Sequence, residues 1–496
     1  YEIPLRLVGS EMCIRDRPEE NYQMIDANVS LTATALDGIQ TKGATEEGGD
    51  AVLESGSNNE QFINELTAYL FYVDNGGNED AYKFAAMKTV TSDGTNSVKT
   101  IEDIVVKVKA TAAGELSDTQ LKVIFLANTK LATPPSNLGD VKTAELEDLV
   151  DFSYVHMGGM RYYVPMFSQI VTIGGGSSYK LLAGTTYDNW VKGSTAPSII
   201  YTNNAAVGAA HRVIEKTSGA EGWTEKSSSY DPASIPDADK IPLTRHVARV
   251  QLQAIDCDFK NNYANASFEL KDVYIANASN TSLIYADAEP YSLDNAKAYS
   301  HGCSYNRDDY FLVNGSKNVA SLHCEMDEGV LIAMTGHSHS SNLNADGSID
   351  YNAKNWFSFN DQTIRGDEQG RKDMPQFYVF EMKGDKDMPS DPGKSDTPSG
   401  YIQTMLILRG DWYPKGKTEG LGNDVVKKDR YYRIPIKQDA ASGIIGVQRN
   451  TIYKIYATIT GEGSKDPDTS ELNACISFSI KVEPWTVITQ TETDVN

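Results

Sequence analysis

The chain has 496 residues, which is enough for two or three domains that each bury a core of their own. Its hydrophobic fraction of 40% and charged fraction of 23% are typical of a globular protein and exclude a disordered one. A formal net charge of -23 argues against nucleic acid and anionic membranes as partners, because both would repel such a surface. No apolar run approaches the ~18 residues of a transmembrane segment.

The N-terminal segment 1–17 differs in character from the rest of the chain. It contains "LVGSEMCIRDR", which resembles translated sequencing-adapter read-through, and it lacks the pattern of a secretory signal or a lipobox. We therefore expect segment 1–17 to be an artefact, and the natural start with its export signal to be missing.

The first expected strand spans residues 27–36, where large and small side chains alternate with the period of a strand. The side chains on its expected inner face are Val29, Leu31, Ala33 and Ala35. Residues 37–60 follow as an acidic, glycine-containing segment in which Lys42 is the only basic residue. A basic residue in such a segment is accessible to proteases, although an ordinary solvated loop lysine is the alternative.

Short strand patterns and turn signals continue from "INELTAYLFYVDNGG" at 63–77 onwards. The stretch 215–240 is poor in large aliphatic residues and rich in Ser, Asp, Pro and Gly, so we place a domain boundary there. This gives an N-terminal domain over 18–240 and a C-terminal domain over 241–496. The sequence therefore predicts an all-β fold with two tandem antiparallel β-sandwich domains and long loops.

The last residues, 485–496, again alternate with a period of two. The side chains on one face of this expected strand are Trp485, Val487, Thr489, Thr491, Thr493 and Val495. No later segment of this sequence can return to pair with it. The strand therefore either completes its own domain, frays, or pairs with another molecule.

Four stretches together resemble the fimbrillins of Bacteroidota, the major fimbrial subunits of type V pili: "INELTAYLFYVDNGG", "LTRHVARVQL", "FELKDVYIANAS" and "VQRNTIYKIYATITGEG". The resemblance implies transthyretin-like, Greek-key sandwiches and export as a lipoprotein precursor to the cell outer membrane. It implies that a trypsin-like protease cuts at Lys42–Gly43 and removes strand 27–36. The terminal strand 485–496 of another copy then takes its place, by donor-strand exchange. Lys42 departs from the arginine that is usual in this family.

This resemblance implies a pilin that is no enzyme, assembles with its own copies and related fimbrial subunits, and supports adhesion and biofilm formation on the cell surface. One alternative is a fimbrial tip or accessory adhesin that binds a host or bacterial surface ligand. A second is a secreted carbohydrate-binding β-sandwich. No Ser/His/Asp arrangement can be argued from the sequence, so nothing predicts catalysis.

Metal ligands are sparse, and the sequence predicts no metal and no cofactor. His301-x-Cys303, His323-Cys324 and His337-x-His339 offer nitrogen and sulfur to zinc, but without the short Cys-x2-Cys spacing of structural sites. "NLNADGSID" at 342–350 resembles a calcium loop, yet Ala353 stands where a bidentate Glu belongs. The simpler interpretation of that loop is an Asp-Gly turn.

The cysteines outside the N-terminal segment allow three disulfide pairings, among which the sequence cannot choose. They are Cys257, Cys303, Cys324 and Cys475. Because four cysteines are few for a chain of this length, we expect most of them to be buried free thiols.

Overall fold

The structure is a computed structural model, and it describes residues 23–35, 62–73, 77–110, 120–147, 163–173, 181–182, 199–202, 214–216, 223–225, 240–276, 278, 281–285, 323–351, 353, 355–359, 362–363, 375–383, 404–417, 425–436, 446–465 and 476–484. Nearly all regular structure in these segments is β-strand, which confirms the predicted all-β class. The helical elements among them are α3 (Leu138–Thr143) and the 3-10 turns η1 (Glu79–Ala81), η6 (Asn261–Tyr263) and η9 (His339–Asn342). None of the described helices is long and apolar enough to cross a membrane.

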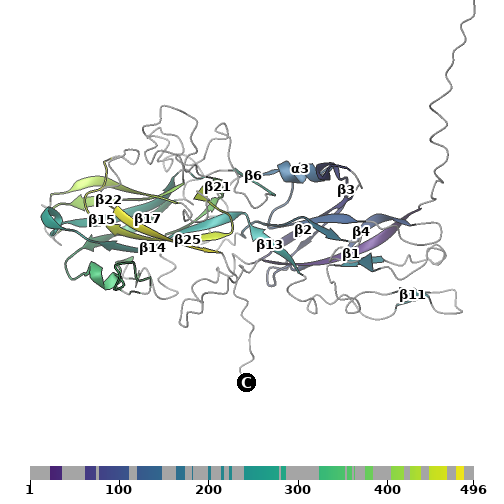
Figure 1. The fold of residues 1–496 in the computed structure, drawn as a ribbon, viewed down its shortest axis with the longest axis horizontal. Coiled ribbons are helices and arrows are strands. Elements are labelled where there is room, and N and C mark those ends of the chain that lie inside the picture. Colours follow the sequence, from purple (N-terminus) through teal and green to yellow (C-terminus); the bar gives the residue numbers. More distant parts are fainter. Residues whose placement is uncertain are drawn as a thin grey trace, which may run out of the picture.

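The N-terminal unit consists of β1 (Gln23–Ala35), β2 (Glu65–Tyr72), β3 (Phe84–Thr91), β4 (Thr100–Ala110), β5 (Leu121–Ala127), β6 (Glu145–Glu147), β7 (Met166–Ser168), β8 (Val171–Ile173), β9 (Leu181–Leu182), β10 (Ile199–Thr202), β11 (Ile214–Lys216), β12 (Trp223–Glu225) and β13 (Ile241–Arg245). Its main sheet has the order β3-β2-β5-β7-β13-β1-β10-β9, with β4 paired to β1 and β8 paired to β5. Figure 1 shows β1, β2, β3 and β4 grouped together, with β13 at one end of this group.

Strand β2 is buried on both faces, because its apolar residues form a continuous run. Ala68 and Leu70 point into a cluster that they share with β4 and β13, so the sheet encloses this cluster as a sandwich does. Tyr69 and Phe71, one residue out of phase, point into a different cluster on the other face. The N-terminal unit therefore has one core of its own and a second apolar face that needs a partner.

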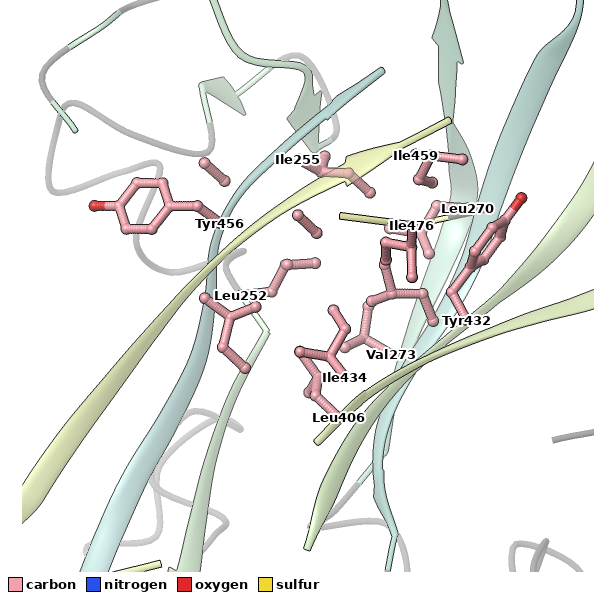
Figure 2. Packing of buried hydrophobic residues seen from close by; sticks show 14 of the residues in the cluster. Leu252, Ile255, Leu270, Val273, Leu406, Tyr432, Ile434, Tyr456, Ile459 and Ile476 are labelled. Carbon is pink, nitrogen blue, oxygen red and sulfur yellow. The ribbon is translucent and has the colours of Figure 1, made fainter. Parts of the chain in front are cut away.

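The C-terminal unit consists of β14 (Val247–Cys257), β15 (Ser267–Ala276), β16 (Thr281–Leu283), β17 (His323–Ala333), β18 (Ser358–Phe359), β19 (Gln362–Thr363), β20 (Gln376–Phe380), β21 (Met382–Lys383), β22 (Met405–Tyr413), β23 (Lys427–Pro435), β24 (Gly446–Val447), β25 (Thr451–Ile459) and β26 (Ile476–Pro484). Two four-stranded sheets, β20-β14-β25-β26 and β17-β15-β22-β23, make up its body. Figure 2 shows side chains of both sheets interdigitating, such as Leu252 and Ile255 from β14 with Val273 from β15 and Leu406 from β22.

The second apolar face of the N-terminal unit is covered by the C-terminal unit. One hydrophobic cluster contains residues of both units, with Tyr69, Phe71 and Phe167 from the first and Tyr378 and Phe380 from the second. The pairing of β6 with β16 also crosses between the units. We call this shared cluster the seam.

Two buried polar contacts lie at the seam. Arg449 forms a bidentate ion pair with Glu381, with Nε donating to Oε2 at 2.6 Å, and its guanidinium lies 4.9 Å from the centre of the Phe167 ring. His246 Nε2 donates to the carbonyl of Ile284 at 2.7 Å. Because both polar contacts are buried, separating the units would expose a charge pair as well as apolar surface.

The structure places β13 in the sheet of the N-terminal unit, where it pairs with β1 and β7. The composition of residues 215–240 predicts that the second domain starts at Ile241, whereas the chain passes into the sheets of the C-terminal unit only after Arg245. The expected purely antiparallel pairing also differs from the structure, since β1 runs parallel to β10 and β13, and β14 runs parallel to β25.

We expect His246→Gln to make the fold less sensitive to acid. Burial first, and the Arg449 charge second, lower the pKa of His246 from 6.5 to about 3. His246 therefore takes up a proton near pH 6.5 in the unfolded chain, but only near pH 3 in the folded chain. The contribution of neutral His246 to the free energy of unfolding is fully present above pH 6.5. It is lost as the pH falls toward 3, by about 1.4 kcal/mol per pH unit.

Urea unfolding at about pH 7 and about pH 5 measures this effect. The wild type should lose roughly 2 kcal/mol more than His246→Gln between the two conditions. Glutamine retains an N–H that can donate to the carbonyl of Ile284. The variant therefore removes the titrating group while keeping this hydrogen bond. Equal losses in both proteins would mean that His246 is not held neutral.

Candidate assembly site: the first strand and its groove

Strand β1 is a central strand of the N-terminal unit, with neighbours on both sides. On one side it pairs antiparallel with β4, from Gln23 opposite Ala110 to Thr32 opposite Thr100. On its other side it pairs in parallel, first with β10 and then with β13. Figure 1 shows β1 and β4 side by side.

A β-bulge lies where β1 changes its neighbour. Val29 is opposite Ile104 and Leu31 is opposite Ile101, so β4 has one extra residue between these pairs. Before the bulge β1 pairs with β10, and after it with β13. The bulge thus lies where β1 changes its parallel neighbour, and this single strand belongs to both halves of the sheet.

The side chains of β1 that the structure describes on the predicted inner face are deeply buried. Leu31 and Ala33 have 0% exposure and pack in the N-terminal core together with Ile101 of β4 and Leu243 of β13. The structure thus places two of the four residues predicted on the inner face in the core. For the other two, Val29 and Ala35, it describes only the backbone, and Ala35 lies opposite Leu243.

The other predicted assembly residues fall outside the described residues. These are Lys42, Gly43, Trp485, Val487, Thr489, Thr491, Thr493 and Val495. The structure does describe the strand that precedes the tail. Strand β26 lies at the edge of its sheet beside β25, and it ends with Pro484 opposite Thr451, next to the seam residue Ile452.

The sequence patterns predicted strands over the residues on the other side of β1, but not that these strands pair with β1. Ile199–Thr202 and Ile241–Leu243 flank it in parallel register, although they lie far along the chain from it. Parallel pairing requires a crossover and has no short-range signal such as a turn. The strand pattern of "IPLTR" was visible, but its partner was not.

The calcium-like loop forms a tight hydrogen-bonded turn. Gly347 donates its N–H to Asn344 O at 2.9 Å, and Ser348 donates its N–H to Asp346 Oδ1 at 2.9 Å. Asn344 Nδ2 donates to the carbonyl of Ile349. Since these side chains are engaged in an Asx-type turn, the geometry favours the Asp-Gly turn interpretation over a calcium cage.

The histidines that were weighed as zinc ligands, and predicted not to bind a metal, do not meet as one group among the described residues. His323 begins β17, whereas His337 and His339 follow its other end, and His301 and Cys303 are outside the described residues. His337 and His339 instead contact Asp256. Cys257, beside Asp256, is a buried free thiol, and the pairing state of the other cysteines is not described.

The fold defines an all-β sandwich protein with a buried first strand. Residues 27–235, less than half of the chain, match the family model described as "Major fimbrial subunit protein (FimA)". The resemblance seen in the sequence is thereby confirmed. A comparison with curated proteins gives no match.

Solved structures that resemble this chain include proteins from Porphyromonas gingivalis and Parabacteroides distasonis. A fimbrilin from Porphyromonas gingivalis shares 16% identity at a TM-score of 0.47, covering 94% of this chain and 99% of that one. Two proteins described as cell adhesion proteins from Parabacteroides distasonis share 18% and 14% identity at TM-scores of 0.46 and 0.48. They cover 93% and 94% of this chain, and 100% and 98% of their own chains.

We expect Leu31→Ala to destabilise the N-terminal unit strongly. Leu31 is fully buried against β4, so removing its side chain leaves a cavity, and the free energy of unfolding should fall by about 2–5 kcal/mol. Thr34→Ala on the same strand, at a half-buried position, should cost less than about 1 kcal/mol. Chemical denaturation of both variants measures the difference, and equal small losses would show that β1 does not contribute to the core.

Proposed function

We propose that this chain is a structural subunit of a cell-surface fimbria that polymerises by donor-strand exchange. The observation that carries the proposal is the position of β1. It is the first described strand, it lies in the middle of the sheet, and it buries Leu31 and Ala33. A strand so placed can be replaced only by another strand that pairs on both sides and fills the same core.

Loss of β1 would leave an open groove between β4 on one side and β10 and β13 on the other. Strand β4 would lose its partner at nine paired positions, and β10 and β13 would lose their parallel partner. Each ladder hydrogen bond contributes roughly 0.5–1.5 kcal/mol net, and a buried leucine roughly 1.5–3 kcal/mol. An empty groove would therefore be unstable in water and open to pairing with another chain.

In this proposal, proteolysis is the step that allows a donor strand to replace β1. While β1 is tethered to β2 through residues 36–61, its effective concentration is high and it excludes a donor strand. Ordering a donor of ~10 residues costs on the order of 10 kcal/mol or more of backbone entropy, so a donor gains little over the tethered strand. A cut at Lys42–Gly43 by a trypsin-like protease removes the tether and leaves β1 free to diffuse away.

The proposed donor is the segment 485–496 of another copy. It has a period-two pattern and follows directly after the edge strand β26. Extended, it reaches about 40 Å, which is nearly the length of the 13-residue β1. The main-chain bonds would supply affinity, and the alternate side chains would fix the register.

The same proposal places the protein in its setting. A fimbrial subunit acts outside the cell, so we propose export as an outer-membrane lipoprotein, assembly with related subunits, and a role in adhesion and biofilm formation. The two units would adopt transthyretin-like sandwiches, and the role requires no catalytic group.

Cleaved protein should form polymers only when it retains its tail. We expect trypsin-treated full chain to form ladders that resist mild detergent, because exchange requires a whole strand to unzip. The same treatment of a chain ending at Pro484 should give monomers. Electrophoresis without boiling and electron microscopy measure the outcome.

Lys42→Gln provides the control for the trigger, since it removes the only basic residue between β1 and β2. This variant should stay monomeric after treatment. Ladders of equal strength with and without residues 485–496 would refute the tail as donor, and a monomeric full-length product would refute the exchange mechanism.

The face of the donor strand can be tested with one pair of variants. Val487→Asp should weaken assembly at least tenfold, because a buried unpaired carboxylate costs several kcal/mol. Ile488→Asp introduces the same charge one residue along, on the face expected to point outward, and should assemble nearly as well as the wild type. The reverse result would shift the register by one residue, and no effect from either change would exclude this segment as donor.

A further inference from the structure

A cluster of metal-ligating side chains lies at the end of β14, in the C-terminal unit and away from the β1 groove. Asp256 and Cys257 are fully buried at this strand end. His337 reaches them from the turn that follows β17 and is itself only 7% exposed. A carboxylate oxygen, the thiol sulfur and an imidazole nitrogen of these three residues all lie within 4.8 Å of one another.

The local backbone fixes the position of His337. Its N–H donates to the carbonyl of Met334 at 3.1 Å, which closes a turn, and Gly336 in that turn has a φ of +74° that favours glycine. The imidazole packs on the Phe357 ring with 4.3 Å between centroids. Phe357 in turn donates its N–H to Ile255 of β14. The ring is therefore held in place from two elements.

A second histidine holds the other side of the carboxylate. His339 Nδ1 lies 2.6 Å from Asp256 Oδ2, while His337 Nε2 contacts Oδ1. Asn342 is also fully buried here. Its Nδ2 donates to the carbonyl of Asn355 at 2.6 Å, but among the described residues its Oδ1 has no hydrogen-bond partner. A buried polar atom without a partner is rare and needs a physical reason.

The donor set matches one class of ion. Thiolate, imidazole and carboxylate together are the ligands of zinc, and three protein ligands with a hydrogen-bonded carboxylate are common in zinc sites. We propose that Asp256, Cys257 and His337 bind a zinc ion, and that His339 positions the carboxylate through its second oxygen. Binding would replace the thiol proton by a zinc–sulfur bond and release that proton to solvent.

The proposed ion would brace the C-terminal sandwich. Asp256 and Cys257 belong to the sheet of β14, whereas the turn carrying His337 continues from β17 of the opposite sheet. The ion would thus join the two sheets at the end of β14 that is remote from the seam. This inference does not depend on the proposed function, because it concerns residues that take no part in strand exchange.

Isothermal titration of the chelator-treated full chain with zinc chloride tests the site. We expect about one equivalent of zinc to bind with a signal that His337→Asn abolishes, and His339→Asn to weaken binding by about 10–100-fold, as loss of an outer hydrogen bond does. His323→Asn is the matched control, since it makes the same change at the opposite end of β17. Thermal denaturation should show a rise of about 5–10 °C with zinc in hundredfold excess over its dissociation constant.

Cobalt substitution identifies the sulfur ligand without altering the core. The wild-type cobalt form should show thiolate-to-metal charge-transfer absorption, and Cys257→Ser should lose it. A wild type that binds no zinc, or binding that is unchanged in His337→Asn, would overturn the proposal and leave Asp256 as a carboxylate hydrogen-bonded by two histidines. A cobalt spectrum without thiolate absorption in the wild type would overturn the assignment of Cys257.

Discussion

The two-sided pairing of β1 is the constraint on which the N-terminal unit depends. Its neighbours come from residues near position 100 on one side and from residues near positions 200 and 240 on the other. No local rearrangement can bring such distant segments together without an intervening strand. Leu31 and Ala33 complete a core whose other members belong to β2, β4, β5 and β13. The same strand thus closes the sheet and is the part that the proposed exchange would replace.

Within one subunit, the β1 groove and the strand that precedes the proposed donor are linked through paired strands that cross the seam. Strand β13, which flanks β1, runs directly into β14, and β14 pairs with β25, which pairs with β26. A force applied to the chain after Pro484 would therefore be transmitted to the groove of the same subunit through hydrogen-bonded strand pairs and through the covalent link between β14 and β13. The seam and the Arg449–Glu381 ion pair lie at the point where the ladder changes unit.

The sequence predicted individual strands well but not their partners. Alternation in "ELTAYLFY" and in residues 27–36 indicated strands, because the period of side chains is a local property. The pattern of "IPLTRHVARVQL" is continuous, so it could not show that Arg245 ends one sheet and Val247 begins another. Parallel neighbours and the seam depend on contacts between residues far apart in the chain. For the same reason, His337-x-His339 was noticed, while its partner Asp256, much earlier in the chain, looked like the end of an ordinary strand.

Strand β14 connects these features because all eleven of its residues are buried. One face of β14 buries apolar side chains such as Val250 and Leu252, whereas the other buries Arg249, Gln251 and Gln253. Buried polar groups at the two ends of the strand add information about its position along its own axis. At the start, His246 is anchored to the carbonyl of Ile284, and at the end, Asp256 is held by two imidazoles. Because a slip of one residue would leave both buried polar groups without partners, the ends of β14 fix the register of the sandwich, and with it the place where β13 meets the groove.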